Sequence, residues 1–207
     1  MTSAEILPTT LMGLGTGLSL IVAIGAQNAF ILRQGIIGKF VAPIVLFCII
    51  GDVLLIGAGV WSVGQLAHGF TWVLEALGWF GGAFLIWYGF SAARRALQPE
   101  ALTVNPSTQG PATLGKALTT TFAITYLNPH VYLDTFVLLG SLANTHGVEG
   151  RWWFYLGCVL GSVLWFTALG YGSRFLRPIF AKPRAWRVLD GCIALLMFFL
   201  AYQVMFG

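Results

Sequence analysis

The sequence has 207 residues, of which 57% are hydrophobic and 9% are charged, with a formal net charge of +4. Soluble domains carry roughly 45 to 50% apolar and about 25% charged residues, and so few charges cannot cover a water-exposed surface. The composition therefore excludes an ordinary water-soluble globule and indicates an integral membrane protein, whose basic residues bear on orientation in the lipid bilayer and not on nucleic-acid binding.

Six apolar segments follow one another between charged or Pro/Gly-rich breaks. A transmembrane helix needs about 20 residues, and the sequence lacks the alternating ten-residue segments that are typical of a β-barrel. We therefore expect an all-α, polytopic protein with six transmembrane helices and short loops, so that residues 1–207 form a single membrane domain. The segments are 7–32, 41–67, 70–93, 117–143, 152–171 and 186–206.

The basic residues gather in the odd-numbered loops, and only Arg151 falls on the other face. Arg33 and Lys39 follow the first segment, Arg94, Arg95 and Lys116 follow the third, and five more follow the fifth, the last of them at the start of the sixth. Since Lys and Arg favour cytoplasmic loops, this pattern predicts that both termini lie outside the cytoplasm. No basic residue precedes the first segment, which leaves a cytoplasmic N-terminus open as the alternative.

A Pro-rich stretch divides the chain into two halves of three segments. Residues 94–116 are interpreted as a cytoplasmic linker between a first repeat, about 1–93, and a second, about 117–207. Because three is an odd number, the second half enters the membrane from the opposite face, and the halves form an inverted repeat. Many transporters have this architecture, with a binding site at the midplane.

Weak self-similarity between the halves supports the repeat. Residues 51–55 (GDVLL) resemble residues 161–165 (GSVLW), each in the second segment of its half. Asn28 and Asn128 correspond in the same way in the first segments.

Two carboxylates lie inside apolar segments. Asp52 is about 11 residues into the second segment, a depth of ~17 Å that is close to the centre of a ~30 Å hydrocarbon core. Asp134 lies well within the fourth segment. A charge at such depth costs at least about 2.5 kcal/mol, and we expect no Lys or Arg inside a segment, so the pair is predicted to bind a cationic substrate or protons. The alternative is a neutral carboxyl group that is hydrogen-bonded between helices.

Residues 128–134 (NPHVYLD) add a helix break to this charge. Pro129 predicts a break in mid-membrane, with Asn128 at the N-cap and Pro129 at the first helical position. Such a helix start suits the carboxylate of a small substrate, and His130 stands four residues from Asp134 on the same face. We expect Asn128, His130, Tyr132 and Asp134 in a substrate- or proton-binding site. The alternative is a Pro kink near the bilayer edge, with His130 bonded to a neighbouring helix.

The first segment contributes two amides, Gln27 and Asn28, among Gly, Leu, Ile and Ala. Amides are unfavourable in lipid, so both are expected to face the interior of the bundle. They could contact substrate, or they could equally form hydrogen bonds between helices.

Together these residues resemble the LysE family of basic amino-acid exporters, in particular its lysine and arginine branch. The family often has Pro at the position of Ala26, and this departure weakens a prediction that the first helix is broken like the fourth. The sister branch of threonine and homoserine exporters typically carries Gly-Pro-Asn without a glutamine, so Gln27 favours a cationic substrate. The matching pieces are residues 25–30 (GAQNAF), 33–35 (RQG), Asp52, 87–90 (WYGF) and 128–135 (NPHVYLDT).

The resemblance implies a transporter, not an enzyme, that exports L-arginine or L-lysine across the bacterial inner membrane without a cofactor, and we expect no metal site. A bundle of this size can also form a homodimer, which the sequence leaves open. Outward movement of a cation against an inside-negative potential costs about 2.3 kcal/mol per 100 mV, so we expect exchange for protons, with Asp52 and Asp134 neutralised in turn by substrate and by H⁺. Two alternatives are an exporter of a neutral amino acid or a metal ion, and an intramembrane aspartyl protease in which the two aspartates form a dyad.

Overall fold

The computed structural model describes residues 3–22, 25–62, 71–97 and 111–206, and its secondary structure in these ranges is helical throughout. The expected all-α class is confirmed. The elements are α1 (Ser3–Ile21), α2 (Ala26–Ile37), α3 (Val41–Ser62), α4 (Thr71–Leu97), α5 (Leu114–Tyr126), α6 (Pro129–Val131), the π-helix η2 (Tyr132–Leu138), α7 (Leu139–Asn144), α8 (Gly147–Gly172), the short 3-10 helices η3 (Ser173–Leu176) and η4 (Ile179–Ala181), and α9 (Pro183–Phe206). Both ends of the predicted linker, residues 94–97 and 114–116, are helical, and residues 98–110 lie outside the described ranges.

Several of these helices are suited to a membrane. By length and composition, three helices in the described ranges could cross one: Val41–Trp61, Gly147–Leu176 and Pro183–Phe206. The pair α1 and α2 adds a fourth if a bent pair counts as one span. Only 28–39% of each of the three apolar windows is buried inside the protein, so their apolar side chains face outward as lipid-exposed side chains do.

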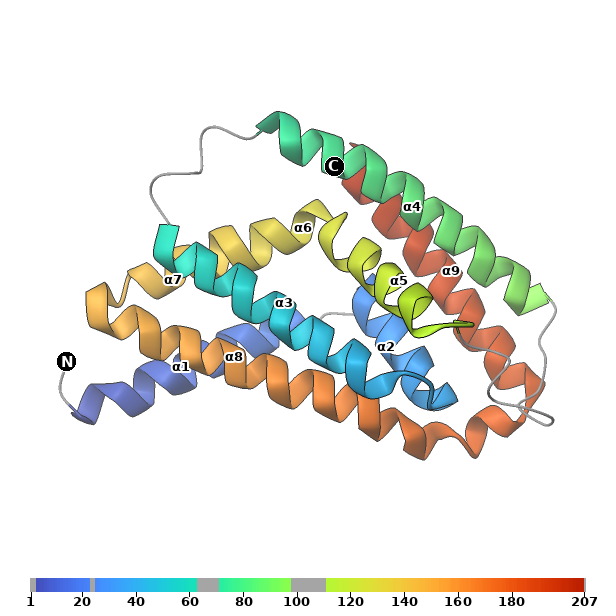
Figure 1. The fold of residues 1–207 in the computed structure, drawn as a ribbon, viewed down its shortest axis with the longest axis horizontal. Coiled ribbons are helices and arrows are strands. Elements are labelled where there is room, and N and C mark those ends of the chain that lie inside the picture. The colour runs from blue at the N-terminus through green and yellow to red at the C-terminus, as the bar shows by residue number, and fades with distance from the viewer. Residues whose placement is uncertain (1–2, 23–24, 63–70, 98–110, 207) are drawn as a thin grey trace.

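Glycines bring α1 and α8 into close contact along their length (Figure 1). A Cβ atom on Gly13 would lie 2.0 Å from the carbonyl oxygen of Phe154, and one on Gly157 would lie 2.0 Å from that of Thr10. Neither glycine could be replaced without separating the two backbones. Small residues have this function in membrane helix packing.

The first predicted segment is broken, which corrects the expectation drawn from Ala26. Helices α1 and α2 are bent by 83° relative to each other. Gly25 is extended (φ −118°, ψ 178°) and precedes α2, while the side-chain amide of Asn28 donates to the carbonyl oxygen of Ile21 at 2.6 Å. A proline is therefore not needed, because the Asn28 amide satisfies a carbonyl that the end of α1 leaves without a helical partner.

A second break separates α5 from α6. Helix α5 ends at Tyr126 and α6 begins at Pro129. The Tyr132 hydroxyl donates to the carbonyl oxygen of Tyr126 at 2.9 Å, so a side chain beyond the break again satisfies a carbonyl before it. At both breaks, therefore, a side chain after the break donates a hydrogen bond to a backbone carbonyl before it.

All the basic residues of the described ranges except Arg151, which lies near the start of α8, are toward one end of the bundle. Helices α2, α4 and α8 end there, and α3, α5 and α9 begin there, at the right of Figure 1. Arg94 and Arg95 are in the last turn of α4, and Arg174 is in the last turn of η3. We refer to this end as the basic end.

Candidate functional site

A cavity of about 330 Å³ lies where the two broken helices meet. Its wall includes the end of α1, the start of α2, the second break and two residues each from η2 and α9, with one residue each from α3, α5, α6, α7 and α8. The lining residues are Leu20, Ile21, Gly25, Ala26, Gln27, Asn28, Asp52, Ile124, Asn128, Val131, Asp134, Thr135, Leu139, Phe166, Leu200 and Gln203.

Both predicted carboxylates line this cavity, but their surroundings differ. Asp52 lies in the middle of α3 and is 5% exposed, and its Oδ2 accepts a hydrogen bond of 2.6 Å from the Ser162 hydroxyl on α8. Asp134 lies on η2 and is exposed. The site thus combines a buried, hydrogen-bonded carboxyl group with an accessible one. A π-helix is uncommon and often marks a functional position.

The two amides of α2 have different contacts. Asn28 donates to the end of α1 and accepts from the indole N–H of Trp165 at 3.2 Å, so its side chain holds the broken helix together. Gln27 accepts from the Thr125 hydroxyl at 3.3 Å, while its buried Nε2 has no hydrogen-bond partner among the described residues. A buried donor of this kind is costly unless a ligand or water satisfies it. Of the two amides, Gln27 is therefore the one with an N–H group left for a ligand, and the Cys48 thiol lies beside it.

The predicted residues of the fourth segment are divided. Asn128 lines the cavity with Asp134. Tyr132 is not among the lining residues, since its hydroxyl is bonded to the break itself. The side chain of His130 lies outside the described part of the structure.

Three polar residues at the site are not found by the sequence reasoning. Ser162 contacts Asp52, while Thr135 and Gln203 line the cavity. Ser162 does have a signal, because it occupies the position that the self-similarity pairs with Asp52. Gln203 is a polar residue in the last apolar segment, which is the same kind of signal as Gln27.

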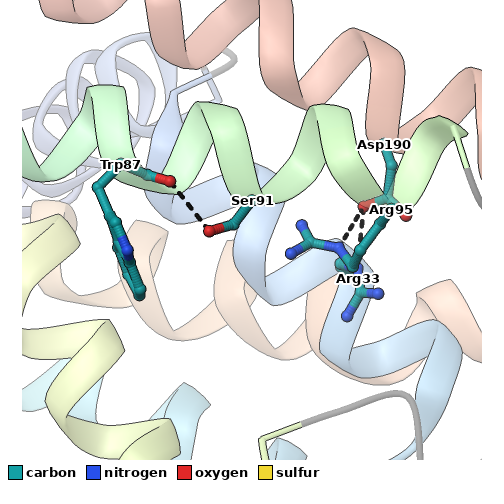
Figure 2. Close-up of polar contacts among 5 residues, drawn as sticks. All are labelled: Arg33, Trp87, Ser91, Arg95 and Asp190. Atoms are coloured by element: carbon teal, nitrogen blue, oxygen red, sulfur yellow. Dashed lines mark hydrogen bonds and ion pairs between the residues drawn. The ribbon is translucent and has the colours of Figure 1, made fainter.

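A buried ion cluster near the basic end corrects the assignment of Arg33 to a loop (Figure 2). Arg33 lies inside α2 and is 6% exposed, and Asp190 on α9 is 2% exposed. The Asp190 Oδ1 accepts from Nε of Arg33 at 3.2 Å and from Nε of Arg95 at 3.1 Å. The two guanidinium groups also stack near the rings of Trp186 and Tyr88, at 5.5 Å and 5.7 Å. A basic residue is thus buried in a helix of the bundle, and it is satisfied there by the chain itself.

The cavity can bind a small ligand that has a positive and a negative end. Carboxylates at Asp52 and Asp134 attract a cation, and the free amide of Gln27 can donate to a carboxylate. The described lining residues include no His or Cys, and no three His, Cys, Asp or Glu side chains in the described ranges are grouped to hold a metal ion.

Known proteins resemble this chain over most of its length. The LysE type translocator model matches residues 18–207. A Mycobacterium tuberculosis protein named "Putative amino-acid transporter Rv0488" is 45% identical over 91% of this chain and 92% of its own. Proteins named "Arginine exporter protein ArgO" from Enterobacter sp. and Escherichia coli are 41% and 39% identical, each over 93% of this chain and 90% of theirs. No solved structure matches.

Proposed function

The chain belongs to the LysE type translocator family, and from this membership we propose that it exports L-arginine or L-lysine across the bacterial inner membrane in exchange for protons. As a family member it is an amino-acid transporter and not an enzyme. The family resemblance noted in the sequence is thereby confirmed. The substrate and the coupling to protons are the proposed part.

A single observation is the main support: Asp52 and Asp134 line one cavity. A cationic side chain between them would stabilise the two carboxylate charges in place of the hydration that they lose on burial. Two arginine exporters among the relatives agree with a guanidinium substrate. A neutral amino acid brings only its α-ammonium group as a positive charge, whereas arginine and lysine also bring a cationic side chain for the second carboxylate. A protease reaction does not fit a transporter family.

The α-carboxylate of the substrate requires a donor at the other end of the site. The free Nε2 of Gln27 and the polar helix start at Asn128 and Pro129 are the groups proposed for it. In this arrangement the substrate spans from the amide side of the cavity to the carboxylates. His130 remains a candidate through its place in the motif.

Protons supply the driving force in this proposal. A monovalent cation that leaves an inside-negative cell moves uphill by about 2.3 kcal/mol per 100 mV, so uniport would run inward. An inward proton moves downhill in the same field, so exchange for a proton offsets this electrical cost. Each carboxyl group is then neutralised either by the cationic substrate or by a bound proton. No unpaired carboxylate charge has to be buried in the membrane.

The proposal includes six spans arranged as an inverted repeat. The spans are α1–α2, α3, α4, α5–α7, α8 and α9, and the basic end faces the cytoplasm. Asp52 and Ser162, which the self-similarity pairs, are hydrogen-bonded to each other, and Asn28 and Asn128 line the same cavity. Equivalent residues meet in this way at the two-fold axis of a repeat.

Export of labelled amino acids tests the proposal. Cells that express the chain are loaded with labelled arginine, lysine or threonine, and efflux is measured at several external pH values. We expect efflux of arginine or lysine but not of threonine, and loss of it in Asp52→Asn and Asp134→Asn. Glu149→Gln is the control, because Glu149 is an exposed acid that does not line the cavity. Equal retention of all three amino acids with and without the chain would refute the proposal.

A further inference from the structure

The hydroxyl group of Ser162 has two acceptors within reach. It donates to Oδ2 of Asp52 at 2.6 Å, and the carbonyl oxygen of Cys158, one helical turn earlier, lies at 3.4 Å. Ser162 is 0% exposed and Asp52 is 5% exposed, so neither group can rely on bulk water. The hydroxyl has one proton and can serve only one of the two acceptors at a time.

A buried carboxyl group that gains and loses a proton needs a partner in both states. The charged form needs a donor, and the neutral form is itself a donor that needs an acceptor. A backbone N–H or an arginine could serve only the first state. A serine hydroxyl can serve both, provided that its own proton has somewhere else to go.

We propose that Ser162 is a positioning residue that stabilises both protonation states of Asp52. With charged Asp52 it donates to Oδ2. When Asp52 binds a proton, the acid donates to the Ser162 Oγ, and the hydroxyl proton turns to the Cys158 carbonyl oxygen. Ser162 keeps its own proton throughout, so the proton on Asp52 comes from the cavity and returns to it.

None of the other titratable groups described around Asp52 can stabilise both of its protonation states as the Ser162 hydroxyl does. They are Cys48 on α3, Cys158 on α8, Tyr126 on α5 and Asp134 across the cavity. None of these four is a cation. The Cys158 thiol donates to the carbonyl oxygen of Gly13 at 3.2 Å, so its proton is directed away from Asp52.

Ser173 provides a matched comparison within the same chain. It is also a buried serine, at 5% exposure, and it donates to the carbonyl oxygen of Gly170 at 3.0 Å. A hydroxyl that bonds back to its own helix is common and has a purely local effect. Ser162 differs because its shorter bond goes to a carboxylate on another helix.

Infrared titration of the full-length protein in lipid bilayers tests the inference. The carbonyl stretch of protonated Asp52 is identified by its loss in Asp52→Asn, and it is followed against pH in the wild type, Ser162→Ala, Ser162→Thr and Ser173→Ala. A hydrogen bond to a charged group is roughly twice as strong as one between neutral groups. Ser162→Ala therefore moves the titration midpoint toward higher pH by about one unit, which corresponds to ~1.4 kcal/mol.

The position of the same band reports the neutral state. A carboxyl group that has lost its acceptor absorbs at higher frequency, so we expect the band of Ser162→Ala to shift upward. Ser162→Thr retains the hydroxyl and Ser173→Ala leaves Asp52 untouched, so both should match the wild type. An unchanged midpoint in Ser162→Ala would overturn the inference, and a shifted midpoint with an unchanged band position would overturn its neutral-state half.

The inference rests on the proposed proton exchange for its meaning in transport, but the titration does not require transport. If export were independent of pH, proton exchange would be wrong, and the band of Asp52 would still respond to Ser162 or fail to do so. The two failures are therefore distinguishable.

Discussion

Replacement of Asp190 by asparagine removes a carboxylate that Arg33 and Arg95 share in the ion cluster. The side chains of Arg33 and Asp190 are 7% and 3% exposed, whereas that of Arg95 is 32% exposed. In Asp190→Asn the guanidinium group of Arg33 would remain buried and would lose its ion pair with the Asp190 carboxylate. Arg95 can turn its head group toward water, so its loss of a partner matters less.

The expected destabilisation follows from these exposures. Removing one partner of a buried pair costs about 3–5 kcal/mol, while a pair that is a third exposed is worth about 0–1 kcal/mol because water screens it. In a chain of this size 1 kcal/mol corresponds to about 2–4 °C in Tm. We therefore expect Asp190→Asn to lower Tm by roughly 6–20 °C and Arg95→Gln by at most ~4 °C.

Thermal unfolding in detergent, followed by tryptophan fluorescence, measures these shifts. Arg187→Gln is the control, because Arg187 is an exposed charge on the same helix, three residues before Asp190. The double variant Arg33→Leu/Asp190→Leu should recover most of the loss, since apolar residues of similar size can replace a buried pair. If Asp190→Asn unfolded at the temperature of Arg187→Gln, the cluster would not hold α2 against α4 and α9.

Two further predictions concern packing and access. Gly13→Ala should lower Tm, because the new Cβ would meet the carbonyl oxygen of Phe154. Gly15→Ala is the control: its Cβ meets nothing within 4 Å, so Tm should stay the same or rise through the better helix propensity of Ala. Equal Tm values in the two variants would contradict the close α1–α8 contact. In a background without the native cysteines, Asp134→Cys should react with a water-soluble thiol reagent at least tenfold faster than Asp52→Cys, because Asp134 is exposed and Asp52 is buried. Similar reaction rates would contradict this difference in access.

The helices and several polar residues that line the cavity are predictable from local sequence. Long apolar segments mark the helices, and Pro129 marks a break because it cannot continue the hydrogen-bond ladder. Asp52 and Asp134 stand out because a carboxylate in an apolar segment is energetically costly, which indicates a functional role. These signals depend on one segment at a time, which is why they can be found without a structure.

The features that were missed depend on contacts between distant segments. The bend before Ala26 is stabilised by Asn28 reaching back to α1, and hydropathy does not register such a contact. Arg33 follows the apolar segment and therefore resembles a loop residue, until Asp190, 157 positions later, is seen to pair with it. The same limit applies to Ser162, whose partner lies on another helix.

Coupled flux of protons and arginine tests the proposed exchange most directly. Proteoliposomes are loaded with arginine and a pH-sensitive dye, and the lumen is followed as arginine leaves down its gradient. We predict that the lumen acidifies in the wild type and in Glu149→Gln, and that acidification is lost in Asp52→Asn and Asp134→Asn. Arginine efflux without acidification in the wild type, or equal acidification in the two aspartate variants, would contradict proton exchange at these carboxylates.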